Sequence, residues 1–179
     1  MMQASRGQNF FELFGLPIGF DVDTADLSRR YRDLQQSVHP DRYASGSPEE
    51  RRLSMQFTTL INEAFQTLKD PVRRGRYLLS LDGVTTNEES DTSMRPEFLM
   101  EQMELREGLE EARQQDDPHK RLAEIANDIE RQMQGKIDEF RACYGQGDIG
   151  RAGARNAVRE MQFLEKLLRE IDNLDEELG

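Results

Sequence analysis

The chain has 179 residues, of which 36% are apolar and 33% charged, and its formal net charge is −11. This length suits one large domain or two small ones, and so polar a composition favours helices that each bury a single stripe. The net negative charge argues against nucleic acid and anionic membrane surfaces as partners, since both bind an excess of Lys and Arg. No apolar run approaches the roughly 18 residues of a membrane span, and residues 1–20 do not resemble a signal peptide. We therefore expect a cytoplasmic protein.

The charge is distributed unevenly along the chain. Residues 1–82 contain 11 basic and 11 acidic side chains, whereas residues 83–179 contain 13 basic and 24 acidic ones. Such asymmetry predicts two modules with different partners. The polar stretch after Asp82 contains one large apolar residue, Val84, before Met94, and it is typical of a linker. We predict modules at residues 8–82 and 96–179, joined by a linker at 83–95.

Cysteine content limits the chemistry. The single cysteine, Cys143, excludes an internal disulfide and a multi-cysteine zinc site. We expect no metal and no other cofactor. Its position, one step from a predicted buried stripe, favours a role as a small apolar filler.

The first module contains the pattern of an antiparallel helical hairpin. Asp23 is a suitable N-cap for a first helix, which Pro40 ends because proline disfavours helical geometry in the residue before it. Ser47, followed by Pro48 and by Glu50 three residues on, predicts the start of a second helix. A short further helix follows Pro71, and no segment alternates as a strand would. The predicted buried stripes are Leu27, Tyr31, Leu34 and Val38 in the first helix and Leu53, Phe57, Leu60, Ile61, Ala64, Phe65 and Leu68 in the second.

The loop of this hairpin contains the tripeptide His39-Pro40-Asp41, and the helix before it carries Arg29, Arg30 and Arg32. Proline and aspartate are also common in ordinary turns, so the tripeptide alone leaves a purely structural role open. Its position in the loop of an arginine-rich hairpin resembles the J domain. The resemblance implies that the tripeptide triggers ATP hydrolysis by a DnaK-type chaperone. It also implies that the three arginines dock on an acidic face of that chaperone.

An enzymatic role for the same residues is not expected. We expect no serine or cysteine to be placed where His39 could activate it, and Pro40 restricts how Asp41 could orient the imidazole. The other histidine, His119, follows Pro118 at a helix start, where we expect it to be solvated.

The second module has the pattern of an up-down-up bundle of three helices. Proline opens the first helix, which runs from residue 96 to about 115, and also the second, which starts at residue 118. Residues 145–150 match the dinucleotide-binding pattern G-x-G-x-x-G but join two helices, whereas that fingerprint requires a strand before it. We interpret Gly145 as a helix C-cap and Asp148 as the N-cap of the third helix. The predicted stripe of this third helix is Ala157, Met161, Leu164, Leu168, Ile171 and Leu178.

The first bundle helix has an unusual outer face. A helical wheel groups Phe98, Leu105, Leu109 and Ala112 as a core stripe. It places five residues opposite this stripe: Met100, Met103, Glu104, Glu107 and Glu111. Either the helix is rotated and buries both methionines, or they form an exposed, adaptable patch with an acidic rim that suits a protein partner.

Several segments together are similar to the HscB family, J-domain co-chaperones of iron–sulfur cluster assembly. They are His39-Pro-Asp-Arg-Tyr-Ala-Ser-Gly-Ser47, Tyr77-Leu-Leu-Ser-Leu81, Phe98-Leu-Met-Glu-Gln-Met-Glu-Leu-Arg-Glu107 and Phe163-Leu-Glu-Lys-Leu167. The resemblance implies a non-enzymatic adaptor that stimulates the chaperone HscA and presents the cluster scaffold IscU to it. It implies a scaffold site at Leu99, Met100, Met103, Glu104, Glu107, Glu111 and Phe163. The chain lacks the N-terminal cysteine-rich metal site of some members, and Gly108 replaces a residue that is usually charged, at a cost of about 1 kcal/mol in helix stability.

A second interpretation stays open. The acidic bundle could serve a different client of a J-domain co-chaperone, or could only dimerise through Met100 and Met103. The match around Phe98 to Glu107 favours the scaffold.

Overall fold

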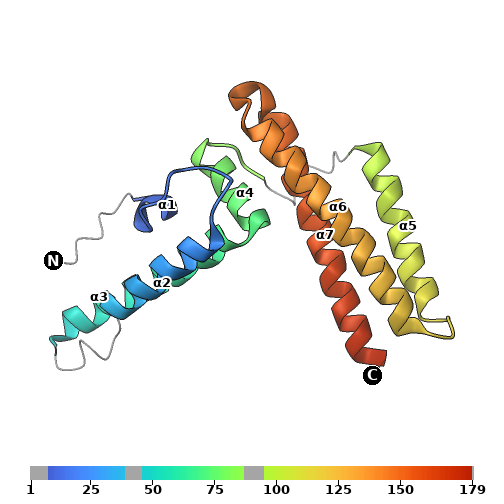
Figure 1. Cartoon of the computed structure of the whole chain (residues 1–179), viewed down its shortest axis with the longest axis horizontal. Helices are drawn as coiled ribbons and strands as arrows, with labels where there is room; N and C mark the ends of the chain where they lie inside the picture. Colours follow the sequence, from blue (N-terminus) through green and yellow to red (C-terminus); the bar gives the residue numbers. More distant parts are fainter. Residues whose placement is uncertain (1–7, 39–45, 87–94, 179) are drawn as a thin grey trace. The chain divides into compact units, whose positions relative to one another are not determined.

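The computed structural model describes residues 8–38, 46–86 and 95–178, and within these ranges the regular elements are all helices (Figure 1). The predicted all-α class, a helical hairpin followed by a helical bundle, is confirmed. The chain divides into two compact units, Met1–Leu78 and Leu79–Gly179. Most of the predicted linker lies outside the described residues, so the module boundaries stay a prediction.

Local capping defines the first four helices, of which the last crosses the division after Leu78. They are α1 (Phe10–Leu13), α2 (Thr24–Val38), α3 (Pro48–Lys69) and α4 (Pro71–Leu81). The Asp23 carboxylate accepts hydrogen bonds from the backbone N–H groups of Ala25 and Asp26, at 2.9 and 3.1 Å, as expected of an N-cap. Ser47 and Glu50 form the predicted capping box at the start of α3.

Helices α2 and α3 pack against each other through the predicted stripes. Leu27 and Val38 on α2 are buried, as are Ile61, Ala64, Phe65 and Leu68 on α3. Tyr31 stacks on Phe65 with 4.0 Å between ring centroids, and its hydroxyl donates a hydrogen bond to Asn62. The prediction for Leu53 is wrong, because its side chain is 44% exposed. The next residue, Ser54, contacts the last residue of α2, so the first turn of α3 extends beyond the end of its partner.

The second unit contains α5 (Pro96–Ala112), α6 (Pro118–Tyr144) and α7 (Arg151–Leu178), which form the predicted bundle. Figure 1 shows α6 and α7 side by side, with α5 alongside α6. All three helices contribute to one core, made of Phe98, Leu109, Ala112, Leu122, Ile125, Ile129, Leu164, Leu167 and Ile171. Two details differ from expectation: α5 ends at Ala112, and Leu178 in the last turn of α7 is 40% exposed.

The connection between α6 and α7 differs from the predicted cap. A short 3-10 helix, Gly147–Gly150, precedes α7, and Asp148 lies inside it, paired with Arg151 at 2.8 Å. Gly145 is the C-cap of α6, as predicted, but the left-handed residue is Gly147, with φ of 61°. Gly150 is required by close packing, since a Cβ there would lie 1.8 Å from the carbonyl oxygen of Cys143. The G-x-G-x-x-G pattern thus serves a tight turn between two helices.

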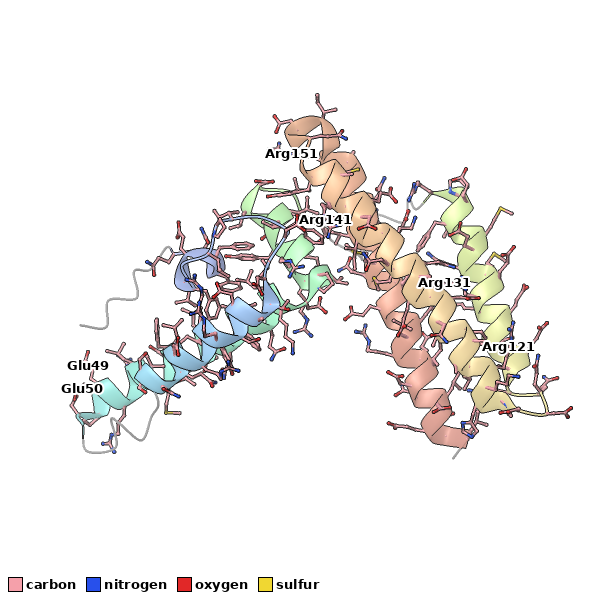
Figure 2. The ribbon with its side chains drawn as sticks, viewed as in Figure 1. Glu49, Glu50, Arg121, Arg131, Arg141 and Arg151 are labelled. Carbon is pink, nitrogen blue, oxygen red and sulfur yellow. The ribbon has the colours of Figure 1, made fainter. Side chains whose placement is uncertain are left out.

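Arginines on the surface of the bundle pair with acidic neighbours on the same chain segment. Arg121, Arg131 and Arg141 lie along α6, and Arg151 lies at the start of α7 (Figure 2). Each forms an ion pair with an acidic residue three positions away. These pairs reduce the positive field that a nucleic-acid backbone would need. Among the described residues, no helix has both the length and the apolar character that crossing a membrane requires.

Candidate functional site: an exposed face of α5 and the α2–α3 hairpin

The orientation of α5 decides between the two interpretations of its methionines. Phe98, Leu109 and Ala112 are 3%, 5% and 0% exposed, whereas Met100 and Met103 are 65% and 63% exposed. The prediction that both methionines lie outside the core is therefore confirmed, and the rotated-helix alternative is wrong. Leu99, on the flank between the two faces, is 43% exposed.

The predicted acidic rim lies on the same side of α5. Glu104, Glu107 and Glu111 are all exposed, and their spacing places them beside the two methionines along about three turns. An apolar surface with flexible side chains and carboxylates around it is suited to bind a protein that offers apolar and basic groups.

Phe163, the predicted site residue on α7, is half-buried. Its ring meets Phe98 edge to face, with 5.8 Å between centroids, and the Arg106 guanidinium lies 5.6 Å from its centroid. Such aromatic and cation–π contacts favour a fixed ring position. Phe163 thus contacts α5 from behind, while the other six predicted residues lie on α5 itself.

A buried ionic network, which the sequence analysis did not identify, lies at the start of α5. Glu160 on α7 is only 2% exposed, and its two carboxylate oxygens accept hydrogen bonds from Arg95 at 2.7 and 2.6 Å. Lys136 on α6 approaches the same carboxylate at 2.7 Å, and Glu139 lies 3.3 Å from Arg95. The hydrogen bond to Glu160 raises the pKa of Arg95 above its ordinary value. A charged residue within an apolar stripe is the signal that could have revealed the network, because Glu160 lies three residues after Ala157 and four before Leu164, both buried on α7.

The three arginines of α2 have different surroundings. Arg30 donates to the backbone carbonyls of Phe14 and Gly15 at 2.9 and 3.2 Å, and to Asp26 at 2.7 Å. Arg29 also pairs with Asp26, and the hydrogen bonds from both arginines hold the pKa of that carboxyl below its usual value. Arg32 and Arg29 are exposed, whereas Arg30 is half-buried. Arg30 therefore connects α2 to the segment after α1, in addition to any contact with a partner.

The tripeptide His39, Pro40 and Asp41 lies outside the described residues, but the helix ends beside it are well defined. The Ser54 hydroxyl donates a 2.6 Å hydrogen bond to the carbonyl of Val38, the last residue of α2. On the other side, Ser47 is the N-cap of α3, and its hydrogen bonds with Glu50 lower the pKa of that carboxyl. Val38 itself is buried, as its place in the α2 stripe predicts.

The described residues also lack the geometry of a metal site with three protein ligands. In residues 8–38, 46–86 and 95–178, no three His, Cys, Asp or Glu side chains converge as metal ligands would. The side chain of His119 is 52% exposed, as predicted, and its Nδ1 also lies 2.7 Å from the Asp175 carboxylate on α7. Cys143 is a free thiol that packs against Gly150 and Gly153.

Comparison with known proteins accounts for both units. Residues 9–77 match the DnaJ domain family, and residues 94–172 match the family described as the HSCB C-terminal oligomerisation domain. A co-chaperone protein HscB homolog from Shewanella amazonensis is 40% identical, over 95% of this chain and 98% of its own length. The chain belongs to the HscB family of co-chaperones. An HscB homolog from Aromatoleum aromaticum is 44% identical, over 99% of each chain.

Solved HscB structures have the same fold. The chaperone HscB from Vibrio cholerae superposes with a TM-score of 0.85 at 38% identity, covering 96% of this chain and all of its own. Human co-chaperone HscB also gives a TM-score of 0.85, at 30% identity, covering 94% of this chain and 82% of its own. Both units of this chain are therefore arranged internally as in HscB proteins.

Proposed function

We propose that this protein binds the iron–sulfur cluster scaffold IscU through α5, delivers it to the DnaK-type chaperone HscA, and stimulates the ATPase of that chaperone. As part of the same proposal, it acts in the cytoplasm as an adaptor without catalytic activity of its own. The observation that carries the proposal is the exposed α5 face with Met100 and Met103, in a chain of the HscB family.

The scaffold surface comprises Leu99, Met100, Met103, Glu104, Glu107, Glu111 and Phe163. Met100 and Met103 supply apolar area that loses water only when a partner covers it, which favours binding by about 1.5–3 kcal/mol for each fully buried side chain. Their flexible thioethers adapt to an uneven partner surface. The carboxylates attract a basic partner from a distance and select its orientation, because exposed charges act mainly on association rate.

The chaperone surface comprises Arg29, Arg30, Arg32, His39, Pro40 and Asp41. Arg29 and Arg32 are exposed on α2 and offer positive charge to an acidic partner. The tripeptide follows directly after Val38, whose carbonyl is held by Ser54. A fixed helix end beside the tripeptide supports its presentation to the chaperone as the trigger for ATP hydrolysis.

The test is a titration of IscU into the full chain, compared with the double variant Met100→Ala and Met103→Ala. We expect at least a tenfold weaker affinity with little change in melting temperature, because both side chains lie outside the core. Met55→Ala is the matched control, since Met55 on α3 is 63% exposed and belongs to the other unit. Equal affinity of the double variant and the wild type would refute the proposed scaffold surface.

The same methionines could instead join two copies of this chain. The description of the matched C-terminal family as an oligomerisation domain favours this second candidate. Sedimentation of the wild type over a wide concentration range distinguishes the two: a dimer that the double variant abolishes, without any IscU binding, would replace the scaffold proposal. A third outcome is that the chain stimulates the ATPase of HscA without IscU and does not bind IscU. This result would indicate that the J domain serves a different client.

A further inference from the structure

Helix α5 is held at its start by a polar contact outside its apolar stripe, which we call the anchor. Arg95 is the N-cap residue of α5, and its side chain makes no cap hydrogen bond to the helix. Instead, the guanidinium makes two parallel hydrogen bonds with the Glu160 carboxylate on α7. A bidentate Arg–carboxylate pair fixes both distance and orientation, so it constrains the helix that follows more tightly than apolar contacts do.

The anchor also contacts the aromatic residues behind the proposed scaffold surface. Lys136 pairs with Glu160 at 2.7 Å, and its ammonium lies 5.7 Å from the centroid of the Phe98 ring. Phe98 is next to Leu99 in the sequence and meets Phe163 edge to face. Phe98 thus connects the ionic network to two residues of the proposed surface, to Leu99 along the chain and to Phe163 through the ring contact. The network itself lies on the opposite, inner side of α5.

The burial of Glu160 indicates that its ion pairs do more than the exposed ion pairs on the protein surface. Glu160 is 2% exposed, and a buried carboxylate is costly unless cations and hydrogen bonds compensate it. An apolar residue at this position would pack without that cost, but it would not select one position for Arg95. The remaining ion pairs of α6 described above are exposed and join residues of the same helix, so they do not position α5.

We infer that Arg95, Glu160 and Lys136 are positioning residues that hold the start of α5 in the one placement in which Met100 and Met103 can bind the scaffold together. Without the negative charge of Glu160, Arg95 and Lys136 lose their buried common partner and keep only the longer contacts with half-buried Glu139, at 3.3 and 3.4 Å. Their mutual repulsion is then compensated less well. The first turns of α5 then leave this placement, and the binding-competent fraction falls. Apparent scaffold affinity falls by the same factor. The binding part of this inference rests on the proposed function.

The experiment uses the full chain with Glu160→Gln, which keeps the size of the side chain and removes its charge. Two controls accompany it: Asp128→Asn removes an equal charge from the exposed surface of α6, and Ala154→Gly loosens the buried side of α7. Amide hydrogen exchange is measured for residues 97–104 and for α6 and α7, and IscU affinity is measured where all variants are folded. We expect Glu160→Gln to speed exchange in residues 97–104 at least tenfold relative to α6 and α7, and to weaken IscU binding at least fivefold. Arg95→Lys, which keeps the charge, should restore most of both properties relative to Arg95→Met.

Each result decides the inference. If Glu160→Gln speeds amide exchange equally in α5, α6 and α7, as expected for Ala154→Gly, the network only stabilises the bundle. The inference that it positions α5 would then be wrong. Loss of affinity to the same extent in Asp128→Asn would assign the effect to overall charge. If wild-type chain does not bind IscU, the proposed function fails, and the exchange pattern alone decides whether the network positions α5.

Discussion

Helices α2 and α5 each carry one of the two proposed partner surfaces, and they differ in where their charged side chains are used. On α2, Asp26 binds both Arg29 and Arg30, and Arg30 also holds two backbone carbonyls of the segment before the helix. On α5, Glu104 and Glu107 are exposed, and the ionic anchor comes from Arg95 before the helix. The charged side chains of α2 therefore both stabilise the fold and face the proposed partner. On α5, the stabilising ion pairs and the proposed binding surface lie on opposite sides of the helix. This separation makes the α5 surface easier to alter without unfolding the protein.

The largest expected effect concerns the tripeptide next to α2. His39→Gln should reduce ATPase stimulation of HscA to background, because the tripeptide is the proposed trigger. Steady-state ATPase measurements with and without IscU test this, with circular dichroism to verify an unchanged melting temperature. The double variant of Met100 and Met103 should keep the basal stimulation. Normal stimulation by His39→Gln would contradict the assignment of the first unit as the chaperone-binding part.

Arg32 and Arg30 should respond differently to substitution, which tests the dual use of charge on α2. Arg32→Glu should weaken stimulation several-fold at low salt and leave the melting temperature unchanged, because its side chain is exposed. The effect should shrink as salt rises, since exposed charges are screened over roughly 8 Å at physiological ionic strength.

Arg30→Ala should instead lower the free energy of unfolding by about 1 kcal/mol, because it removes the hydrogen bonds to Phe14 and Asp26. Chemical denaturation of both variants provides the measurement. If Arg30→Ala were as stable as the wild type, the contrast between α2 and α5 would disappear.

Charge reversal on α5 should act on the rate of scaffold association. Glu104→Lys combined with Glu107→Lys should slow association about tenfold at low salt, and should change dissociation much less. Stopped-flow measurements at several salt concentrations separate the two rates. Glu130→Lys with Glu176→Lys alters net charge equally on exposed positions of α6 and α7. Equal slowing in this control would mean that the net charge of the unit, rather than the α5 rim, attracts the scaffold.

The smallest expected effect concerns the inner side of α5. Gly108→Ala should stabilise the bundle by up to about 1 kcal/mol, since alanine favours a helix and its Cβ would lie at an ordinary 3.7 Å from Ile125. Thermal unfolding should show a rise of a few degrees with unchanged IscU affinity. Gly150→Ala is the contrasting variant and should lower stability, because a Cβ there overlaps the backbone of Cys143. A destabilising Gly108→Ala would indicate that α5 packs more tightly than the described contacts show.

Features set by neighbouring residues along the chain were predictable. The capping box of Ser47 and Glu50, the N-cap Asp23 and the exposed face of α5 depend on spacings of three and four residues, which helical geometry determines by itself. The family resemblance proposed the same α5 face as a binding surface, and that assignment of function stays a prediction.

The sequence did not predict features that depend on where a neighbouring helix ends or on how closely another segment approaches. Leu53 matches its stripe but is exposed, because α2 ends at the residue that contacts Ser54. Asp148 has the composition of an N-cap, yet close approach of Gly150 to Cys143 imposes a tighter 3-10 turn there.

The role of individual charges was decided by tertiary structure alone. Periodicity placed Arg29, Arg30 and Arg32 on one helix, but only the position of the Phe14 carbonyl distinguishes Arg30 from the other two. Likewise, Glu160 is one of many acidic residues in the sequence, and it is buried because Arg95 and Lys136 meet it from two other helices. A carboxylate is buried at low cost only where cations from other parts of the chain compensate it. The position of Glu160 in an apolar stripe indicates that it is buried, but the sequence around it does not show which cations meet it.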